Sequence, residues 1–430
     1  MRFRRILLFL FTVACSCLTA CTVADPPAAG EPFPATHLPG GEGFGRNALD
    51  HPPLMAIVHF PAAGFDDPQT IQNYAQADLL VIETSNVWSA AHPNVLAQIR
   101  AANPDITIVG YISAHACFLS WAHANPATHP YLNSWYEATL PYWSYSTTGD
   151  TMLSWPGKVL LNILDPDCRT AMVGVIAEQQ ALASNKLDGV FWDHFGVQLW
   201  VKQNIPGVEG EPDMDSDGIA HADDPDEIAA YRLASEELIR ELRAAMGERF
   251  VQVVNGSRAL MDSTFAALTD GMMYENFPDV GFSGPQKMKN CLDLNRYNNL
   301  FTARHWPRTL NGGPWLILSN KMHFSFTDSD GEWVEYNPGD INRVVALLTD
   351  TGVSYHSDNP VHSYGWPEIA LDLGPATSGV IWDGDILTRT FANGRVTLTF
   401  TSGSWPIPFD FEIVQDGQVV QALDYPYHYP

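Results

Sequence analysis

The sequence predicts an α/β protein in which a closed (β/α)8 barrel is followed by a small antiparallel β module. Three observations lead to this prediction. Eight short apolar runs rich in β-forming residues recur between residues 55 and 356, segments with helical spacing separate most of them, and after residue 370 short β-type runs alternate with tight turns. A chain of 430 residues is long enough for one large domain with a small appendage.

Each of the eight runs is apolar and leads into a polar residue, as expected of buried strands in a parallel sheet. They cover residues 55–60, 79–83, 106–113, 189–193, 250–255, 271–275, 315–319 and 352–356. Eight such units favour a closed barrel over residues 51–370 rather than an open doubly wound sheet. No Gly-x-Gly-x-x-Gly follows the first run and no Gly-Lys-Ser/Thr occurs, which argues against nucleotide binding.

Three helices between these runs have a clear start, because an aspartate directly precedes a proline. The pairs are Asp67-Pro68, Asp165-Pro166 before a helix reaching Ala183, and Asp224-Pro225 before an amphipathic stretch through Met246. The aspartate caps free backbone amides, and proline fits the first helical turn. Strands and helices are therefore expected to alternate.

The last sixty residues, 371–430, have a different pattern. Short β-type runs at 380–382, 387–391, 396–401 and 409–414 are separated by Asp-Gly, Asn-Gly and Ser-Gly turns. We expect a small antiparallel module with a structural role and no separate activity.

The first residues are typical of a secretory signal. Three arginines precede an apolar run at residues 6–14, which is too short to span a bilayer as a permanent helix. The run leads to Leu18-Thr19-Ala20-Cys21, which resembles the lipobox of bacterial lipoproteins, where the cysteine becomes the lipidated N-terminus. A chance cysteine near an ordinary cleavage site is the alternative.

We therefore expect a signal peptide at residues 1–20, a lipid on Cys21 and a tether rich in Pro, Gly and Ala at 21–50. The protein would be exported and anchored to the bacterial cell envelope through this lipid alone. Of six cysteines, Cys117, Cys168 and Cys291 would remain for the domain. They lack metal-type spacing, and either a disulfide between Cys117 and Cys168 or three buried thiols fit the sequence.

The chain is strongly acidic, with 49 Asp and Glu against 23 Lys and Arg and a net charge of −26. Losing the three arginines of the signal makes the mature charge about −29. Such a field repels nucleic acid and favours a neutral or cationic substrate, or one held by stacking. Plain solubility of an exported monomer explains the charge equally well.

The carboxyl ends of the strands in a parallel barrel meet at one rim, where such folds carry their chemistry. Asp193 and Glu275 end the fourth and sixth predicted strands. Glycoside hydrolysis needs one carboxyl group that protonates the leaving oxygen and another that attacks the anomeric carbon or activates water. We expect Asp193 to be the nucleophile or charge stabiliser and Glu275 the general acid/base.

The aromatic neighbours Tyr274 and Phe277 would raise the pKa of Glu275, as a proton donor requires. Glu83, which ends the second predicted strand, is the rival donor. Retention or inversion depends on the separation of the two carboxyl groups, which the sequence leaves open. Sugar identity, linkage and exo or endo action are open as well.

The remaining polar and aromatic residues near the strand ends are candidates for binding the glycan. They are His59, Glu83, Trp88, Tyr111, Trp192, His194, Asn255, Tyr274, Asn276, Ser319, His356 and Asp358. Tryptophans are frequent in the connections after the second, third and fourth strands, at 88, 121, 135, 143, 155 and 200. We expect two or three of them to stack on sugars in the cleft and the others to pack in the core.

The segment after the fourth run contains an acidic loop with the spacing of a calcium site. Carboxylates alternate at Asp213, Asp215 and Asp217, a glycine follows, Ile219 supplies a backbone carbonyl and Asp224 closes the loop. The closing residue is Asp where an EF-hand has Glu, and no EF-hand helix precedes the loop. We expect a structural Ca²⁺ that rigidifies the loop, with a solvated acidic loop as the alternative, and no organic cofactor.

Three segments carry a resemblance to a known group: Asp188-Gly-Val-Phe-Trp-Asp193, Asn255-Gly256, and Tyr274-Glu275-Asn276-Phe277. Their order and spacing resemble the polygalactosaminidase-like group of barrel glycoside hydrolases and related hypothetical glycosyl hydrolases, and residues 371–374 and 389–394 are similar to the segments that close those barrels. The resemblance spans about residues 55–400 and implies Asp193 and Glu275 as the catalytic pair. The acidic insertion after the fourth strand departs from that group.

Other hydrolase chemistries lack their motifs. No His-x-His, His-Glu-x-x-His or Gly-x-Ser-x-Gly occurs, although His115, His123 and His129 follow the third run and would suit a metal if they clustered. The sequence therefore predicts a glycoside hydrolase acting on a poly- or oligosaccharide. A non-catalytic glycan-binding surface lipoprotein on the same fold is the alternative.

Overall fold

The computed structural model describes residues 54–58, 65, 67–202, 204–256, 263–275, 315–320, 324–327, 333–336, 344–348, 352–356, 373–379, 381–383, 386–400 and 409–422. For 54–58, 274–275, 315–320, 324–327, 333–336 and 352–356 the description covers the backbone alone. The predicted signal, the Cys21 anchor and the tether lie outside these residues, as do His59, Asn276, Asp358 and Cys291.

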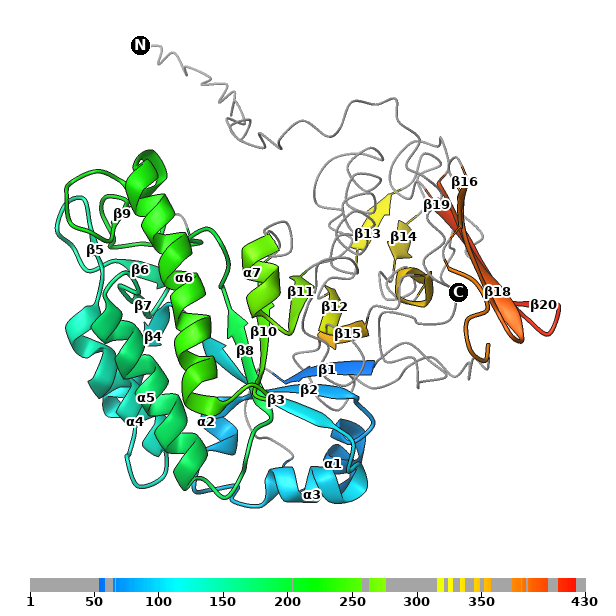
Figure 1. Cartoon of the computed structure of the whole chain (residues 1–430), viewed down its shortest axis with the longest axis horizontal. Helices are drawn as coiled ribbons and strands as arrows, with labels where there is room; N and C mark the ends of the chain where they lie inside the picture. Colours follow the sequence, from blue (N-terminus) through cyan, green and yellow to red (C-terminus); the bar gives the residue numbers. More distant parts are fainter. Residues whose placement is uncertain are drawn as a thin grey trace, which may run out of the picture. The chain divides into compact units, whose positions relative to one another are not determined.

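Eight parallel strands are hydrogen-bonded in a closed circle, in the order β1, β15, β12, β11, β10, β8, β3, β2 (Figure 1). Their bounds are β1 Leu54–Val58, β2 Leu79–Glu83, β3 Thr107–Ser113, β8 Gly189–Asp193, β10 Val251–Asn255, β11 Gly271–Glu275, β12 Trp315–Asn320 and β15 Gly352–His356. Each predicted strand end lies within two residues of the observed one. The α/β class with a parallel sheet is confirmed.

Both faces of the sheet are apolar, because alternate residues of each strand point inward and outward. The inward set is the cluster of Leu79, Val81, Val109, Tyr111, Phe191, Val251, Val253 and Met273. Outward residues such as Leu80, Ile108 and Val190 join a second, larger core beneath the helices. Gly189 is required at the start of β8, since a Cβ there would lie 2.0 Å from the Val251 carbonyl oxygen.

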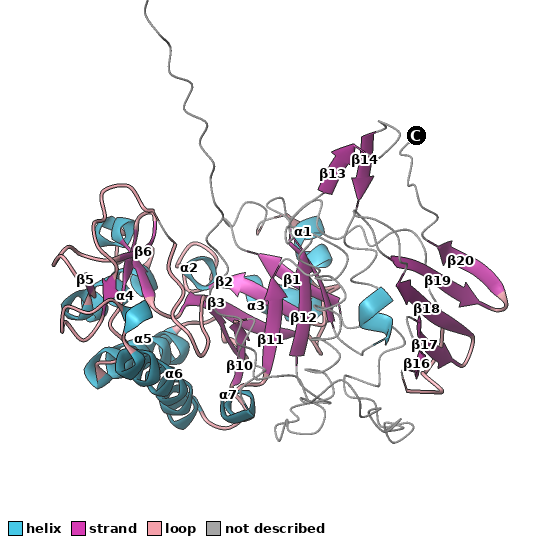
Figure 2. Ribbon diagram, turned by 90° about the horizontal axis from the view of Figure 1, so that it is seen from above, coloured by secondary structure: helices cyan, strands magenta, loops and turns pink. Residues whose placement is uncertain are grey.

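The described helices are α1 Pro68–Tyr74, α2 Thr84–Val87, α3 Val95–Ala102, α4 Pro130–Thr139, α5 Pro166–Leu182, α6 Pro225–Met246 and α7 Ser263–Leu268, with 3-10 turns at Leu119–His123, Leu140–Tyr142 and His221–Asp223. The three predicted starts are confirmed, because Asp67, Asp165 and Asp224 each accept a backbone N–H of the first turn. Helices α4, α5 and α6 pack side by side (Figures 1 and 2). None of the described helices combines the length and apolar character needed to cross a membrane.

Short antiparallel strands lie in the connections after β3, β8 and β12. One sheet contains β4 Ala116–Phe118, β7 Lys158–Leu160 and β6 Leu153–Trp155, a second pairs β5 Tyr145–Ser146 with β9 Pro212–Asp213, and a third pairs β13 Phe324–Thr327 with β14 Trp333–Tyr336. These strands have two to four residues each, too few for a period to be recognised in the sequence.

Five antiparallel strands at the C-terminus form a sheet of their own (Figure 2). They are β16 Ile381–Asp383, β17 Ile386–Phe391, β18 Gly394–Phe400, β19 Phe409–Gln415 and β20 Gln418–Ala422. The first four match predicted runs, and β20 follows a tight turn in which Asp416 and Gly417 have φ of 51° and 77°. Arg389 of β17 donates a hydrogen bond of 2.9 Å to the carbonyl of Leu347.

Candidate active site

The inward faces of the barrel strands lead directly to polar residues at their carboxyl ends. Glu83, Ser113, Asp193 and Asn255 each lie two residues beyond an inward core residue of the same strand. The side-chain period of a strand is two, so these four residues point to the same side as the core residues below them. Strand register places Ser113 beside Asp193, which aligns the two strand ends.

Asp193 lies at the centre of this rim, with 6% of its surface exposed. Its Oδ2 accepts a hydrogen bond from the Tyr111 hydroxyl of β3, and its Oδ1 accepts one of 2.9 Å from the Asn255 amide of β10. His194 Nε2 lies 3.4 Å from Oδ2. Two other strands and the imidazole of the next residue therefore orient this carboxylate.

The backbone after β8 and β10 is shaped to make these contacts. Phe195 N–H donates to the Asn255 carbonyl at 3.1 Å, and a Cβ on Gly256 would lie 2.2 Å from the Phe195 carbonyl oxygen. Only glycine permits this close approach. His194 has a φ of 53°, the left-handed region that non-glycine residues rarely adopt outside turns and functional sites.

Glu83 is the second carboxyl group at this rim whose side chain is described. The pKa of Glu83 is raised to about 7, mainly by burial; Lys158 and the hydrogen bonds with Ser85 oppose this rise, and the charge of Asp193 makes a smaller contribution to it. A carboxyl group with this pKa is substantially protonated near neutral pH. The rim thus pairs an oriented carboxylate on β8 with a group on β2 that is able to give up a proton.

For Tyr274, Glu275, Ser319 and His356 the backbone alone is described, and His59, Asn276 and Asp358 lie outside the described residues. Tyr274 and Glu275 end β11, with Glu275 in register with Ser319 of β12, and His356 ends β15. Among the side chains that are described, the structure brings together Glu83, Asp193, His194 and the two donors Tyr111 and Asn255. These side chains come from strands β2, β3 and β10 and from the end of β8.

The structure contradicts the predicted sugar-binding role of two tryptophans, Trp88 and Trp192. Trp192 is fully buried and donates to Gln252 at 3.0 Å, because it precedes Asp193 by one residue and so points to the opposite face of the sheet. Trp88 is 3% exposed and packs edge-on against Tyr131. Neither indole offers a free face to a sugar, and both belong to the core.

Two residues near the rim were not predicted to lie there, although the sequence suggested His115 as a possible metal ligand. His115 is fully buried, with its ring centroid 6.1 Å from that of His194, and burial lowers the pKa of His115 to about 3, with His194 adding to the effect. Lys158 is 9% exposed, and its Nζ lies 4.5 Å from the centre of the Phe118 ring. Both lie in the connection between β3 and β8, and no sequence motif marks them.

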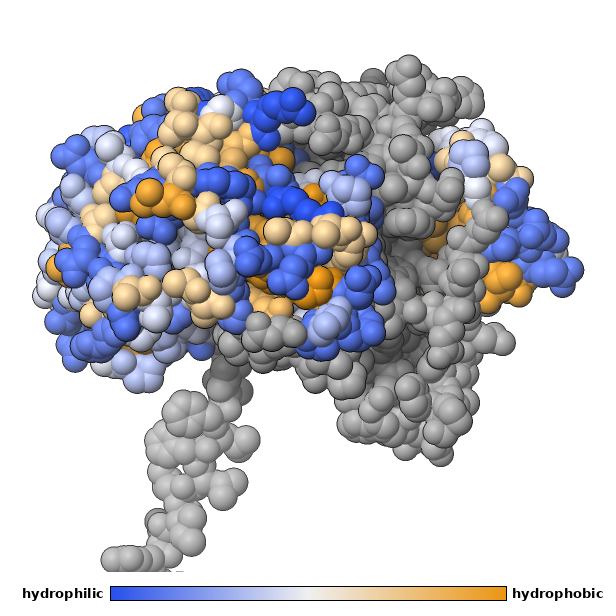
Figure 3. Space-filling model, turned by 90° about the horizontal axis from the view of Figure 1, so that it is seen from below, coloured by the Kyte–Doolittle hydropathy of each residue, from blue (hydrophilic) through white to orange (hydrophobic). Residues whose placement is uncertain are grey.

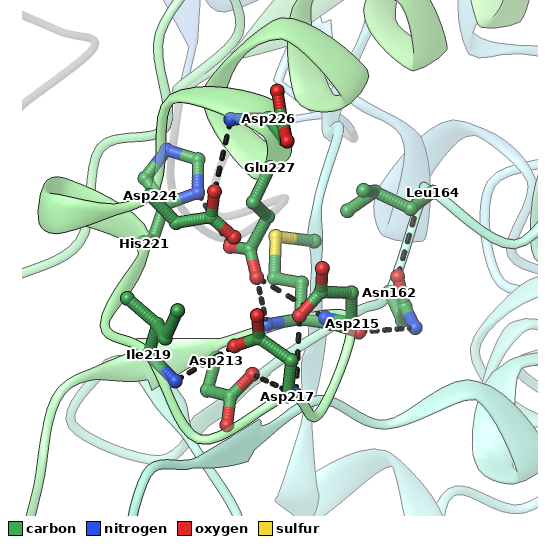
Figure 4. Close-up of polar contacts among 11 residues, drawn as sticks. Asn162, Leu164, Asp213, Asp215, Asp217, Ile219, His221, Asp224, Asp226 and Glu227 are labelled. Atoms are coloured by element: carbon green, nitrogen blue, oxygen red, sulfur yellow. Dashed lines mark hydrogen bonds and ion pairs between the residues drawn. The ribbon is translucent and has the colours of Figure 1, made fainter.

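The acidic loop brings its carboxylates together (Figure 4). Asp213, Asp215 and Glu227 form one group whose oxygens lie within 4.8 Å of one another, and Asp215, Asp217 and Asp224 form another. The mutual repulsion contributes to a raised pKa of Asp215, for which desolvation is the larger cause. Within the described residues, these are the groups able to share an ion, and His115, His123 and His129 form none.

Glu227 of α6 was not among the predicted ligands, because it lies beyond the twelve-residue motif. It is 1% exposed, and its Oε2 accepts the backbone N–H groups of Met214 at 2.8 Å and Asp215 at 3.1 Å. Its Oε1 lies 2.6 Å from His221 Nδ1. Glu227 thus ties the loop to the helix that follows it.

The two described cysteines are free thiols. Cys117 and Cys168 are both buried, and burial raises the pKa of each to about 12. The disulfide that the sequence allowed is therefore absent between them, and both act as small apolar core residues.

A closed parallel barrel with carboxyl groups at the C-terminal rim is an architecture on which sugar-cleaving enzymes are built. Residues 100–395 match the model of hypothetical glycosyl hydrolase family 15. The match covers more than half of the chain, and the chain belongs to this family. This confirms the predicted class of glycoside hydrolase.

Solved structures that are similar to this chain share little sequence with it. The galactosidase domain of the alpha-galactosidase-sucrose kinase AgaSK has 12% identity and a TM-score of 0.43 over 84% of this chain and 48% of its own. The GH36 alpha-galactosidase AgaA from Geobacillus stearothermophilus has 11% identity and a TM-score of 0.42 over 86% and 48%. A debranching enzyme from Nostoc punctiforme has 10% identity and a TM-score of 0.42 over 83% and 90%.

The chain spans about half the length of the galactosidase chains that it matches. A search of curated proteins gives no match.

Proposed function

We propose that this protein hydrolyses a glycosidic bond in a poly- or oligosaccharide at the carboxyl rim of a (β/α)8 barrel with an appended β module. The observation that carries the proposal is the pairing of Asp193, a nearly buried carboxylate held by Tyr111 and Asn255, with Glu83, whose pKa is raised to about 7. Two titratable groups whose environments favour opposite protonation states suit the roles of base and acid.

In this mechanism the protonated carboxyl group of Glu83 donates its proton to the leaving glycosidic oxygen. Asp193 either attacks the anomeric carbon or removes a proton from the attacking water. The hydrogen bonds from Tyr111 and Asn255 fix the orientation of the Asp193 carboxylate. Glu275, two residues beyond Met273 on β11, is the other candidate donor.

Substrates with a good leaving group distinguish the nucleophile or base from the proton donor. Asp193→Asn should abolish cleavage of both natural glycans and aryl glycosides with an acidic leaving group. A variant of the donor should lose the natural glycan but retain the aryl glycoside, because a good leaving group needs no protonation. Comparing Glu83→Gln with Glu275→Gln then identifies the donor, and Glu137→Gln on the exposed face of α4 is the matched control.

NMR identifies which anomer of the product forms first, and this shows whether the anomeric configuration is retained or inverted. The competing assignment is a glycan-binding protein without hydrolytic activity. Wild-type protein that binds a glycan but cleaves neither substrate class would contradict the hydrolase and support the binder.

We also propose that the acidic loop holds a structural Ca²⁺. Calcium prefers six to eight oxygen ligands, and the carboxylates of Asp213, Asp215, Asp217 and Asp224, together with the Ile219 carbonyl, match this preference. The position of Glu227 beside Asp213 and Asp215 supplies a further acid that the sequence motif lacked.

Calorimetric titration with Ca²⁺ should show one site, and the melting temperature should fall on chelation. The double variant Asp215→Asn, Asp217→Asn should remove both effects, whereas Asp150→Asn, in the turn after β5, should leave them unchanged. Equal melting temperatures with and without Ca²⁺ in the wild type would leave a solvated acidic loop as the better account.

A further inference from the structure

Two exposed tryptophans lie beside the proposed catalytic carboxylate. Trp155 ends β6 and is 38% exposed, and Trp200 follows β8 and is 46% exposed. Their rings stack with centroids 5.9 Å apart and planes inclined by 26°. Figure 3 shows that hydrophilic residues cover much of the described surface on the face drawn there.

One imidazole connects this pair to the rim. The His194 ring lies 4.6 Å from the Trp200 ring and 6.2 Å from the Trp155 ring, measured between centroids. The Nε2 of the same imidazole lies 3.4 Å from Asp193 Oδ2. The His194 side chain therefore contacts both the indole pair and the carboxylate.

A backbone hydrogen bond joins the two segments that carry Trp155 and Trp200. Lys202 N–H donates to the Ser154 carbonyl at 2.9 Å, which joins the segment after β8 to strand β6. The Nζ of Lys202 lies 4.2 Å from the centre of the Trp155 ring. Two connections far apart in sequence thus present a preformed aromatic surface with one cation over the Trp155 ring, and preformed surfaces bind with a smaller entropic cost.

We infer that Trp155 and Trp200 form a sugar-binding subsite, in which the ring of one monosaccharide next to the cleaved bond stacks through its C–H face. Lys202 is placed to bind a hydroxyl or carboxylate oxygen of the same sugar. The inference rests on the proposed function, because the position of the subsite relative to Asp193 gives it a role in cleavage. It assigns the stacking role to tryptophans other than Trp88 and Trp192.

Kinetics on a glycan substrate test the subsite. Trp200→Ala and Trp155→Ala should each raise KM by about tenfold while kcat changes by less than about threefold, since stacking of this kind contributes on the order of 1.4 kcal/mol. Trp200→Phe keeps an aromatic face and should recover most of the affinity. Leu182→Ala, which removes a more exposed apolar side chain on α5, is the control and should leave KM unchanged.

A glycan array carrying neutral and acidic oligosaccharides separates this inference from the hydrolase proposal. Asp193→Asn protein should bind at least one glycan, and adding Trp200→Ala should remove that binding. A wild type that cleaves nothing, with array binding that still depends on Trp200, overturns the hydrolase and supports the subsite. Cleavage and array binding that Trp200→Ala and Trp155→Ala leave unchanged overturn the subsite alone.

Discussion

The two ends of barrel strands β8 and β11 carry acidic residues in opposite settings. Asp188 precedes β8 and Asp193 ends it, and Asp270 precedes β11 and Glu275 ends it. At the amino end, Asp270 is 2% exposed and lies 2.9 Å from the guanidinium of Arg243. At the carboxyl end, Asp193 is held by neutral donors, and its charge raises the pKa of Glu83.

The two carboxylates differ in their partners. Asp270 is paired with an arginine and also accepts the Gln252 N–H at 2.9 Å, which is typical of a structural carboxylate. At the carboxyl ends of β2 and β8, burial is the main cause of the raised pKa of Glu83, and the charge of Asp193 adds to it. Acidic residues therefore have different surroundings at the amino end of β11 and at the carboxyl end of β8.

The largest expected effect is that of Asp193→Asn on turnover. Replacing a nucleophile or general base should lower kcat by about 10⁴-fold, while asparagine keeps an oxygen for the Tyr111 hydrogen bond. The free energy of unfolding should change by less than about 1 kcal/mol. Steady-state kinetics with urea unfolding measure both, and strong destabilisation with intact turnover would reverse the assignment of the two ends.

Asp270→Ala should show the opposite pattern. It leaves Arg243 buried without its carboxylate and the Gln252 N–H without an acceptor, which should cost about 3–5 kcal/mol of unfolding free energy. The fraction that remains folded should keep its kcat. Urea unfolding gives the first value and active-site titration gives the second.

The pH dependence of Glu83 sharpens the comparison at the rim. Because the pKa of Glu83 is raised to about 7, activity should fall by about tenfold per pH unit above that value if Glu83 is the proton donor. The folded protein binds this proton more tightly than the unfolded chain, so the contribution to stability is complete below the solvated pKa of about 4.3 and is lost as pH rises through about 7.

Glu83→Gln should remove this loss of stability. The melting temperature of the wild type minus that of the variant should therefore decrease between about pH 4.5 and about pH 7. A difference that stays constant over this range would show that Glu83 titrates as a solvated glutamate and would leave Glu275 as the donor.

Much of the arrangement of these strand ends could be predicted from the sequence, because the sequence signals for strands and helix starts are local. The apolar runs that lead into polar residues predicted the strand ends, the Asp-Pro pairs predicted the helix starts, and Asp193 followed from its place at a strand end. The alternation of side chains within a strand already implied that Trp192, one residue earlier, points away from Asp193.

The remaining features depend on which segments meet in three dimensions. Glu227 reaches the acidic loop from a helix, and Trp155 meets Trp200 across two connections. The pKa of Glu83 depends on burial and on the charges of Asp193 and Lys158, two segments away in the chain. Residue types and spacing contain none of this information.

The smallest expected effect concerns the amino end of β8. Asp188 Oδ2 lies 2.8 Å from Arg100 Nη2, but the two side chains are 42% and 29% exposed, so water screens the pair. Arg100→Ala should therefore cost less than about 1 kcal/mol, and Asp188 keeps the Ile108 N–H as a partner at 2.8 Å. If urea unfolding instead gave a loss comparable to that of Asp270→Ala, burial would not be what distinguishes the two acid–arginine pairs, and the strand position alone would fix their strength.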